Sequence, residues 1–291
     1  MSLFFLTLGF GLVTASVLSL LSVGLSLQFG VTNFVNFAYG SYLSAGMLFT
    51  WTFATKLHFP FVIAALAGVI FTSLLAVIVN EIVFEPFSKR RKSIFYMLIV
   101  TFGLSLVLDS VLQIFYGVGF EKFPITQSEA LHIGPFDFTV VQLWIIAVAI
   151  LSMIVIHLLL TRTSLGKQMR AMSDNPELAK ISGVDTRTVT RSTWALSGAL
   201  AGLGGVVLAL NTVVFQTTTG DDLLFVIFAA VILGGIGQTY GAMLGALVIG
   251  IVTEVSAVWV SSAYKQDVAF LILVVMLLVR PQGIIPAQGK A

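Results

Sequence analysis

Long apolar runs separated by short polar segments extend along the whole chain of 291 residues. The runs are continuous, whereas a transmembrane β-barrel would show alternating apolar and polar positions. Several are about 20 residues long, enough to cross a bilayer as helices that satisfy their own backbone hydrogen bonds. We predict an all-α, polytopic transmembrane helical bundle with about eight to ten spans and a single transmembrane domain over residues 1–291. The predicted spans are 4–28, 37–55, 59–83, 94–116, 138–160, 192–214, 222–238, 241–260 and 267–280.

A polar interruption at residues 30–40 separates the first two runs, with two Asn between two Gly. It predicts either a cytoplasmic turn or a broken, re-entrant helix. The second choice changes the number of crossings and moves the N-terminus from the outside to the inside. Backbone groups freed at a helix break bind polar solutes if they line a cavity. Asn33, Asn36, Tyr39 and Gly40 are therefore candidates for a solute path, and a structural cap or turn is the alternative.

Charge distribution orients the bundle. Only 10% of residues are charged, against about 25% in soluble domains. Twelve of the 15 basic residues fall in two loops, 89–92 and 161–191, and at the C-terminus. Basic loops favour the cytoplasmic face, so we expect these segments inside. Residues 1–8 carry no Lys or Arg, so we expect the first helix to remain uncleaved.

The longer basic loop contains the signals of one short helix at 174–183. Asp174 or Asn175 suits its N-cap, and Pro176 suits its first position. Gly183 suits the left-handed residue beyond its end, and Leu178 and Ile181 share one apolar face. Such a capped helix favours docking on a soluble partner, and an ordinary amphipathic surface helix is the alternative.

Acidic residues within spans are the other candidates, because intramembrane carboxylates often mark function. Asp109 lies in the fourth run, and Glu254 lies in the middle of the eighth, away from both ends. His157 near the end of the fifth run is expected to be interfacial. Asp221 and Asp222 flank an external loop that is either solvated or a contact for an external binding protein.

The sequence contains no pattern of residues typical of a catalytic site. The chain has no Cys, which excludes disulfides, Cys-ligated zinc and thiol catalysis, and its three His lack metal-ligand spacing. No phosphate-binding Gly-x-x-x-x-Gly-Lys-Ser/Thr loop occurs. The glycines at 234–237 suit close helix packing, and the basic loops lack the aromatics typical of nucleic-acid binding. We therefore predict no enzyme activity, no metal, no cofactor in this chain and no nucleic-acid partner.

Seven motifs in order, from about residue 24 to 283, resemble the LIV-type permeases of branched-chain amino acid ABC importers. They are Asn36-Phe37-Ala38-Tyr39-Gly40, Glu85-Pro86-Phe87, Thr101-Phe102-Gly103-Leu104-Ser105, 163–171 with 174–185, 198–205, 233–237 with 241–245, and Arg280-Pro281-Gln282-Gly283. Tyr39 replaces the family's usual His, and Gln238-Thr239-Tyr240 replaces a Ser-hydrophobic-Pro turn. These departures leave the substrate open.

The resemblance implies a multi-pass subunit of the bacterial plasma (inner) membrane that forms half of a substrate path. Its implied partners are a homologous second permease, two ABC ATPase subunits that bind ATP and Mg²⁺, an external substrate-binding protein and membrane lipid. The helix in loop 161–191 would be the coupling helix that fits a groove of the ATPase. The residues assigned to this coupling are Gly166, Arg170, Ala171, Asp174, Asn175, Pro176, Glu177, Ala179 and Gly183.

Several alternatives remain open. Related permeases carry urea, short amides, other amino acids or nucleosides. A secondary transporter driven by an ion gradient would use Asp109 and Glu254 as its ion sites. A membrane enzyme or a purely structural membrane subunit would need neither a path nor a coupling helix.

Overall fold

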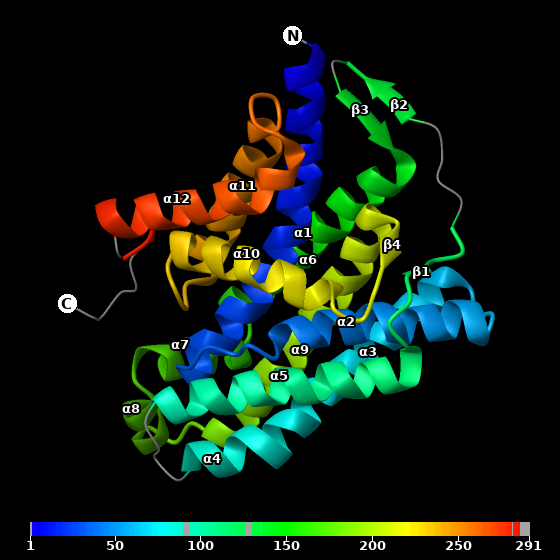
Figure 1. Cartoon of the computed structure of the whole chain (residues 1–291). Coiled ribbons are helices and arrows are strands. Elements are labelled where there is room, and N and C mark those ends of the chain that lie inside the picture. Colours follow the sequence, from blue (N-terminus) through cyan, green and yellow to red (C-terminus); the bar gives the residue numbers. More distant parts are fainter. Residues whose placement is uncertain (1, 90–93, 126–129, 135, 281, 286–291) are drawn as a thin grey trace. The chain divides into compact units, whose positions relative to one another are not determined.

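The computed structural model describes residues 2–89, 94–125, 130–134, 136–280 and 282–285. Arg90, Arg91 and Lys92 of the first basic loop, and Pro281 and Lys290 near the C-terminus, lie outside the described residues. The structure is mainly helical (Figure 1), which confirms the predicted fold class. The main helices are α1 (Ser2–Thr32), α2 (Tyr39–Trp51), α3 (Phe61–Val79), α5 (Ile94–Tyr116), α6 (Val140–Arg162), α9 (Thr186–Thr212), α10 (Thr219–Gly234), α11 (Thr239–Ser256) and α12 (Lys265–Val279).

Short elements complete the chain. They are the π-helical turns η1 (Thr52–Lys56) and η2 (Asn80–Phe84), the helices α4 (Glu85–Lys89), α7 (Ser164–Asp174) and α8 (Pro176–Ile181), the 3-10 turn η3 (Ser262–Tyr264), and the strands β1 (Glu121–Lys122), β2 (Ala130–Ile133), β3 (Phe136–Thr139) and β4 (Val214–Phe215). β2 pairs with β3 and β1 pairs with β4, both antiparallel. The sequence analysis did not predict these small strand pairs, because each is only two to four residues long.

Each of the nine predicted runs corresponds to a helix. Within the described residues, seven helical stretches are long and apolar enough to cross a membrane: 4–32, 61–87, 95–116, 140–162, 186–212, 239–256 and 262–279. The other two runs correspond to α2, whose 13 residues continue directly into η1, and to α10, which has 16 residues. The chain is therefore a multi-pass membrane protein, and these two runs fall outside the seven stretches.

The chain divides into two compact units, and each is described separately. The unit made of residues 27–124 and 159–224 is built around α2, α3 and α9, with α5 against α2. α2 is buried along nearly its whole length, including its hydroxyl residues Ser41, Ser44 and Thr50. Small residues allow this packing: a Cβ at Gly46 would lie 2.5 Å from the Cα of Gly202.

An aromatic cluster fills the same unit between its helices. The ring of Trp194 on α9 stacks on Phe84 of η2 at 4.9 Å and lies 6.3 Å from Phe34, while Tyr42 of α2 meets it edge-on at 6.5 Å. Trp194, Tyr42 and Phe84 are almost fully buried. This cluster joins the segment after α1 to η2 and α9.

The other unit contains residues 1–26, 125–158 and 225–291. In it α1 and α11 approach closely, since a Cβ at Gly250 would lie 2.4 Å from the Cα of Ala15. The glycines of the 233–245 motif also serve close packing, because a Cβ at Gly234 would lie 2.0 Å from the carbonyl oxygen of Gly241. This confirms the prediction of close packing for that motif.

Candidate functional site: helix break and coupling loop

The predicted helix break is present between α1 and α2. α1 ends at Thr32, and Asn33 follows in the left-handed region with φ 58°, its N–H donating to the carbonyl of Phe29 at 2.8 Å. Asparagine is one of the few residues that tolerate this conformation. The chain stays non-helical until Tyr39 begins α2. The interruption is confirmed, while the choice between a turn and a re-entrant helix, and with it the side on which the N-terminus lies, stays a prediction.

Asn36 holds the break together. Its side chain is 0% exposed. The amide Nδ2 donates to Gln28 Oε1 at 3.2 Å, and Oδ1 accepts from the N–H of Ala38 at 3.1 Å. Tyr39 next to it is also fully buried. These contacts give Asn36 and Tyr39 structural roles, and the role of either residue in a substrate path stays a prediction.

Gly40 marks a close approach between the first turns of α2 and α10. A Cβ at Gly40 would lie 2.3 Å from Asp221 Oδ1, and one at Gly220 would lie 2.1 Å from the carbonyl oxygen of Gly40. The N–H of Gly220 donates to Ser44 Oγ at 3.0 Å. The sequence analysis placed Asp221 at the edge of an external loop, but it belongs to the first turn of α10, directly beside α2.

Asp109 on α5 belongs to the same polar cluster. Its Oδ2 accepts from Ser105 Oγ at 3.3 Å, and Ser105 Oγ lies 3.3 Å from Ser41 Oγ on α2. Asp109 and Asp221 lie close enough to interact electrostatically. Polar groups of α2, α5 and α10 therefore meet within otherwise apolar helices. Asp109 is a candidate from the sequence, but its neighbours Ser41 and Asp221 are 68 and 112 positions away in the chain and follow from no local pattern.

The loop 161–191, called the coupling loop below after the role that the family resemblance predicts for it, contains two helices instead of the single one predicted. Thr163 caps α7, accepting from the N–H of Gly166 at 3.1 Å. α7 ends at Asp174, and Asn175 then caps α8 by accepting from the N–H groups of Glu177 and Leu178 at 3.1 and 3.0 Å. Pro176 takes the first position of α8. Of the two proposed caps, Asn175 fills the role and Asp174 does not, because α7 continues through Asp174.

The C-terminus of α8 is closed by a Schellman motif. Gly183 has φ 86°, its N–H donates to the carbonyl of Lys180 at 3.1 Å, and the N–H of Val184 donates to Ala179 at 3.0 Å. The left-handed conformation predicted for Gly183 is confirmed. Both ends of this six-residue helix are thus satisfied by its own loop.

The apolar face of α8 points outward. Leu178 is 61% exposed and Ile181 83% exposed, whereas Ala179 between them is 4% exposed. Of the other residues assigned to coupling, Arg170, Asp174, Asn175, Pro176 and Glu177 are exposed, Ala171 is half-buried and Gly166 is buried. Gly166 packs on the end of α6, where a Cβ would lie 2.5 Å from the Cα of Leu160. Ala179 and Gly166 therefore position the loop, and Leu178 and Ile181 form its available surface.

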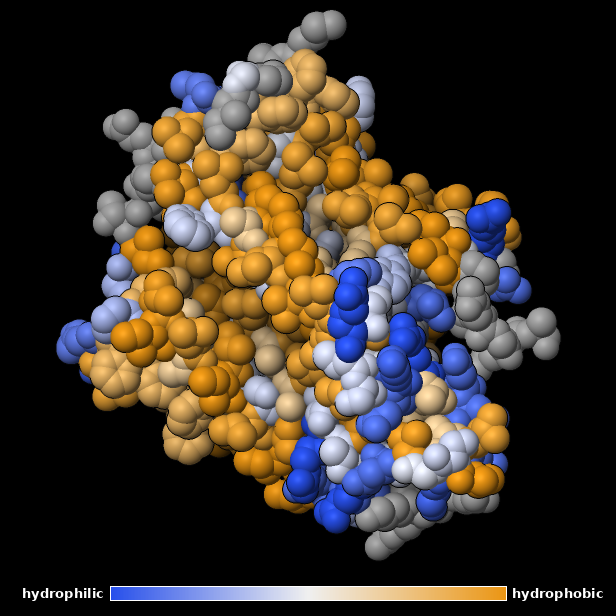
Figure 2. Space-filling model, turned by 180° about the vertical axis from the view of Figure 1, so that it is seen from behind, coloured by the Kyte–Doolittle hydropathy of each residue, from blue (hydrophilic) through white to orange (hydrophobic). Residues whose placement is uncertain are grey.

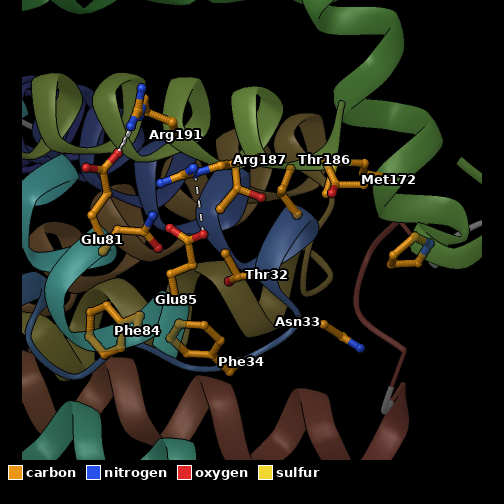
Figure 3. Close-up of a pocket in the computed structure, with 14 residues that line it drawn as sticks. Thr32, Asn33, Phe34, Glu81, Phe84, Glu85, Met172, Thr186, Arg187 and Arg191 are labelled. Atoms are coloured by element: carbon orange, nitrogen blue, oxygen red, sulfur yellow. Dashed lines mark hydrogen bonds and ion pairs between the residues drawn. The ribbon is translucent and has the colours of Figure 1, made fainter. Parts of the chain in front are cut away.

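A pocket of 360 Å³ joins the coupling loop to the helix break (Figure 3). Thr32, Asn33 and Phe34 of the break line one part, and Met172 and Pro176 of the loop line another. The remaining wall comes from η2, α4 and the first turns of α9. Its residues there are Asn80, Glu81, Phe84, Glu85, Thr186, Arg187, Thr190 and Arg191.

Two ion pairs cross this pocket wall. Arg187 Nε lies 3.5 Å from Glu85 Oε1, and Arg191 pairs with Glu81 Oε1 through Nη2 and Nε. The partners are four positions apart on both helices, so the pairs form successive rungs between antiparallel segments. In the sequence, the two arginines indicate only the orientation of the bundle. The i, i+4 spacing of Glu81 and Glu85 was the available signal for this ladder.

Asp185 connects the coupling loop to the ladder. It caps α9 by accepting from the N–H groups of Arg187 and Thr188 at 3.1 and 3.3 Å. The hydroxyl of Thr188, and next its backbone N–H, hold the pKa of Asp185 below its usual range.

In Figure 2, hydrophilic side chains gather at the end where Figure 1 places α4, α7 and α8.

Glu254 lies in the other unit and makes structural contacts. α11 ends at Ser256, so Glu254 is in its last turn; the expectation that it lies in the middle of a span was wrong, because the helix is shorter than the apolar run. Its carboxylate accepts from Thr14 Oγ1 at 3.0 Å and pairs with Lys265 Nζ at 2.5 Å. His157 Nδ1 lies 2.9 Å from the hydroxyl of Tyr240 in the same unit.

Comparison with known proteins identifies the family. Residues 7–279 match the family model described as branched-chain amino acid transport system / permease component. The chain is 30% identical to the probable branched-chain amino acid transport permease protein LivH of Methanocaldococcus jannaschii, over 96% of this chain and 91% of that protein. It is 26% identical to the high-affinity branched-chain amino acid transport system permease protein LivH of Salmonella typhimurium and of Escherichia coli, over 94% of this chain and 93% of each.

No solved structure gives a significant match to the chain. The family match covers both the helix break and the coupling loop, and it extends over nearly all the described helices. It also confirms the prediction of a transport subunit as opposed to an enzyme. The chain belongs to the family of permease components of branched-chain amino acid ABC transport systems.

Proposed function

We propose that this chain is the permease subunit of an ABC importer for branched-chain or related amino acids. It would form half of a path shared with a homologous permease and receive substrate from an external binding protein. Two separate ATPase subunits would bind ATP and Mg²⁺ at the cytoplasmic face. Its location would be the plasma membrane, the inner membrane in a bacterium, with the coupling loop and the C-terminus inside.

The exposed apolar face of α8 carries this proposal. The helix has only six residues, and two of its aliphatic side chains, Leu178 and Ile181, are exposed. A groove on a partner protein would cover this apolar surface. Its caps at Asn175 and Gly183 fix its ends, so a force applied to it moves the helix instead of unwinding it. The names of the relatives describe permease proteins of transport systems, and we propose an ATPase of such a system as the partner.

The pocket provides a route from α8 to the substrate path. Pro176 of α8 and Met172 of α7 line the same 360 Å³ cavity as Asn33 and Phe34 of the break. Asp185 and the ion-pair ladder connect the end of the loop to η2. Movement of α8 would reach the break through α9 and η2, both of which contact Phe34 through the aromatic cluster.

Replacing both Leu178 and Ile181 with Asp tests the coupling surface. Both side chains are largely exposed, so the permease should insert and fold normally. In vesicles containing the complete transporter, we expect substrate uptake and substrate-stimulated ATP hydrolysis to fall about tenfold or more, as for loss of an apolar hot spot. Ser173→Asp, which adds a charge to the exposed face of the same loop, is the control. Wild-type uptake in the double variant would contradict the proposed role of α8.

A further inference from the structure

A second cavity, of 390 Å³, lies in the unit that contains α2, α3 and α5. It is a groove lined along α2 and η1 by residues at 41, 45, 49, 52 and 56, and along α5 by residues at 108, 111, 112, 115 and 116. Each set follows helical spacing, so each lies on one face of its helix. Leu75 of α3 completes the lining.

Two hydrogen bonds show that α2 and α5 run parallel and in register. Ser41 Oγ lies 3.3 Å from Ser105 Oγ, and Thr52 Oγ1 donates to the hydroxyl of Tyr116 at 2.9 Å. The partners are 64 positions apart in both cases. Eleven residues separate the two bonds along α2, which corresponds to about 16 Å of helix.

The groove is narrow for its length. A helix with its side chains is about 10 Å wide or more, and about 16 Å of such a helix takes up far more space than the 390 Å³ of the groove, so a helix of a second subunit does not fit inside it. A single extended hydrocarbon chain has the matching form.

Charge lies at one end of the groove only. Lys56 Nζ lies 5.1 Å from the ring centre of Trp51 and 5.8 Å from that of Tyr116. No carboxylate of the described residues forms an ion pair with Lys56. At the opposite end, Ser41 is already hydrogen-bonded to Ser105. An anionic group at Lys56 is therefore the one charged interaction that the groove leaves open.

The expected orientation puts Lys56 at the outer membrane interface. α5 begins directly after the basic loop 89–92, which the distribution of charges places inside, and ends at Tyr116. Because α2 runs parallel to α5, Lys56 lies toward the outside as well. Trp51 and Tyr116 beside it are typical of the aromatic belt at the level of lipid headgroups.

We propose that this groove binds one phospholipid of the outer leaflet, with an acyl chain between α2 and α5 and the phosphate at Lys56. An acyl chain gains no hydrophobic driving force on moving from lipid or detergent into the groove, so it contributes through packing along α2 and α5, and the phosphate adds the charged contact with Lys56. An amino acid fits poorly, because none of the lining residues is acidic and its ammonium group would have no partner. This lipid site is independent of the substrate and of the ATPase.

Native mass spectrometry of the purified, delipidated permease tests the proposal. The probe is 1-palmitoyl-2-oleoyl phosphatidylglycerol, titrated in detergent against the wild type and two variants. Lys56→Gln removes the charge and should weaken binding about fivefold, the effect of one basic residue near a membrane surface. Val111→Phe fills the groove from the α5 side and should abolish the one-lipid complex.

Matched controls separate the groove from the general lipid annulus. Ile114→Phe adds the same ring on α5, where Ile114 is 79% exposed and does not line the groove. Lys122→Gln removes a different lysine from the same expected side. Both controls should bind like the wild type, and a diacylglycerol with the same chains but no phosphate should bind the wild type as weakly as phosphatidylglycerol binds Lys56→Gln.

Three results would overturn the proposal. Equal lipid binding by the wild type, Lys56→Gln and Val111→Phe would show that the groove is not the site. Displacement of the lipid by leucine would show that the groove takes substrate. Complete disulfide linking of two Val111→Cys chains in membranes would show that this face contacts a second permease.

Discussion

Arg191 on α9 pairs with Glu81 on η2, although the two residues are 110 positions apart in the sequence. One turn further, Arg187 and Glu85 repeat the contact at 3.5 Å. The two arginines lie at the end of the coupling loop, in the first turns of α9, and the two glutamates follow directly on α3. The ladder therefore joins the part of the chain that would receive force from an ATPase to a helix that packs beside the break.

Reversing the charges tests this ladder. Glu81→Arg or Arg191→Glu alone places like charges together, and we expect transport in reconstituted vesicles to fall about tenfold, as for disruption of a specific ion pair. The double variant restores opposite charges and should recover most of the activity. Glu121→Arg, on β1 in the same unit, is the control. Additive losses in the double variant would show that the pair is not the connecting element.

Gly183→Val tests the end of α8. Gly183 has φ 86° with no atoms near a Cβ, so the substitution is disfavoured by backbone conformation and not by crowding. The left-handed conformation should cost a β-branched residue about 1–2 kcal/mol, whereas Gly183→Asn should be tolerated. We expect faster proteolysis of loop 161–191 and reduced coupling only in the Val variant. Equal behaviour of the Val and Asn variants would contradict this assignment.

Asn36→Leu tests the helix break. The substitution leaves the N–H of Ala38 and the side chain of Gln28 without their buried partner, which should cost about 1–3 kcal/mol of stability. We expect a lower thermal midpoint for the purified permease together with reduced uptake. Asn33→Gly, at an exposed position with positive φ, is the matched control and should leave stability unchanged. A loss of uptake by Asn36→Leu with no change in midpoint would instead favour direct contact with substrate.

Cysteine labelling tests the orientation, because the chain has no Cys of its own. Lys180→Cys in α8 and Lys122→Cys in β1 are both exposed and both outside the candidate spans. An impermeant maleimide added to intact cells should label position 122 and not position 180, and permeabilised cells should show both. External labelling of position 180 would reverse the orientation inferred from the basic loops.

The contacts of Glu254 with Thr14 and Lys265 show the limit of predicting a role from a single residue in the sequence. An intramembrane carboxylate suggested a path or an ion site, but tertiary packing provides it with a hydroxyl and an ammonium partner. The coupling loop shows the same limit. Leu178 and Ala179 are adjacent in the helix predicted to contact a partner, but Leu178 is exposed and Ala179 is buried. Burial depends on neighbouring helices, which a local pattern does not contain.

Features that depend on nearby residues can be predicted from the sequence. The positions of the nine helices follow from apolar runs, the caps of α8 from Asn175, Pro176 and Gly183, and the break from the polar residues after α1. Each of these depends on backbone hydrogen bonds and conformational preferences within a few positions of the chain.

Contacts between distant residues depend instead on how the helices assemble. The Glu81–Arg191 pair, the contact of Gly40 with Asp221, and the groove between α2 and α5 join segments 64 to 181 positions apart. A helix in lipid is apolar on most of its faces, so the sequence pattern does not indicate which face is covered by protein. Close packing of small residues and the pairing of a few polar groups make that choice, and they exist only once the helices are assembled.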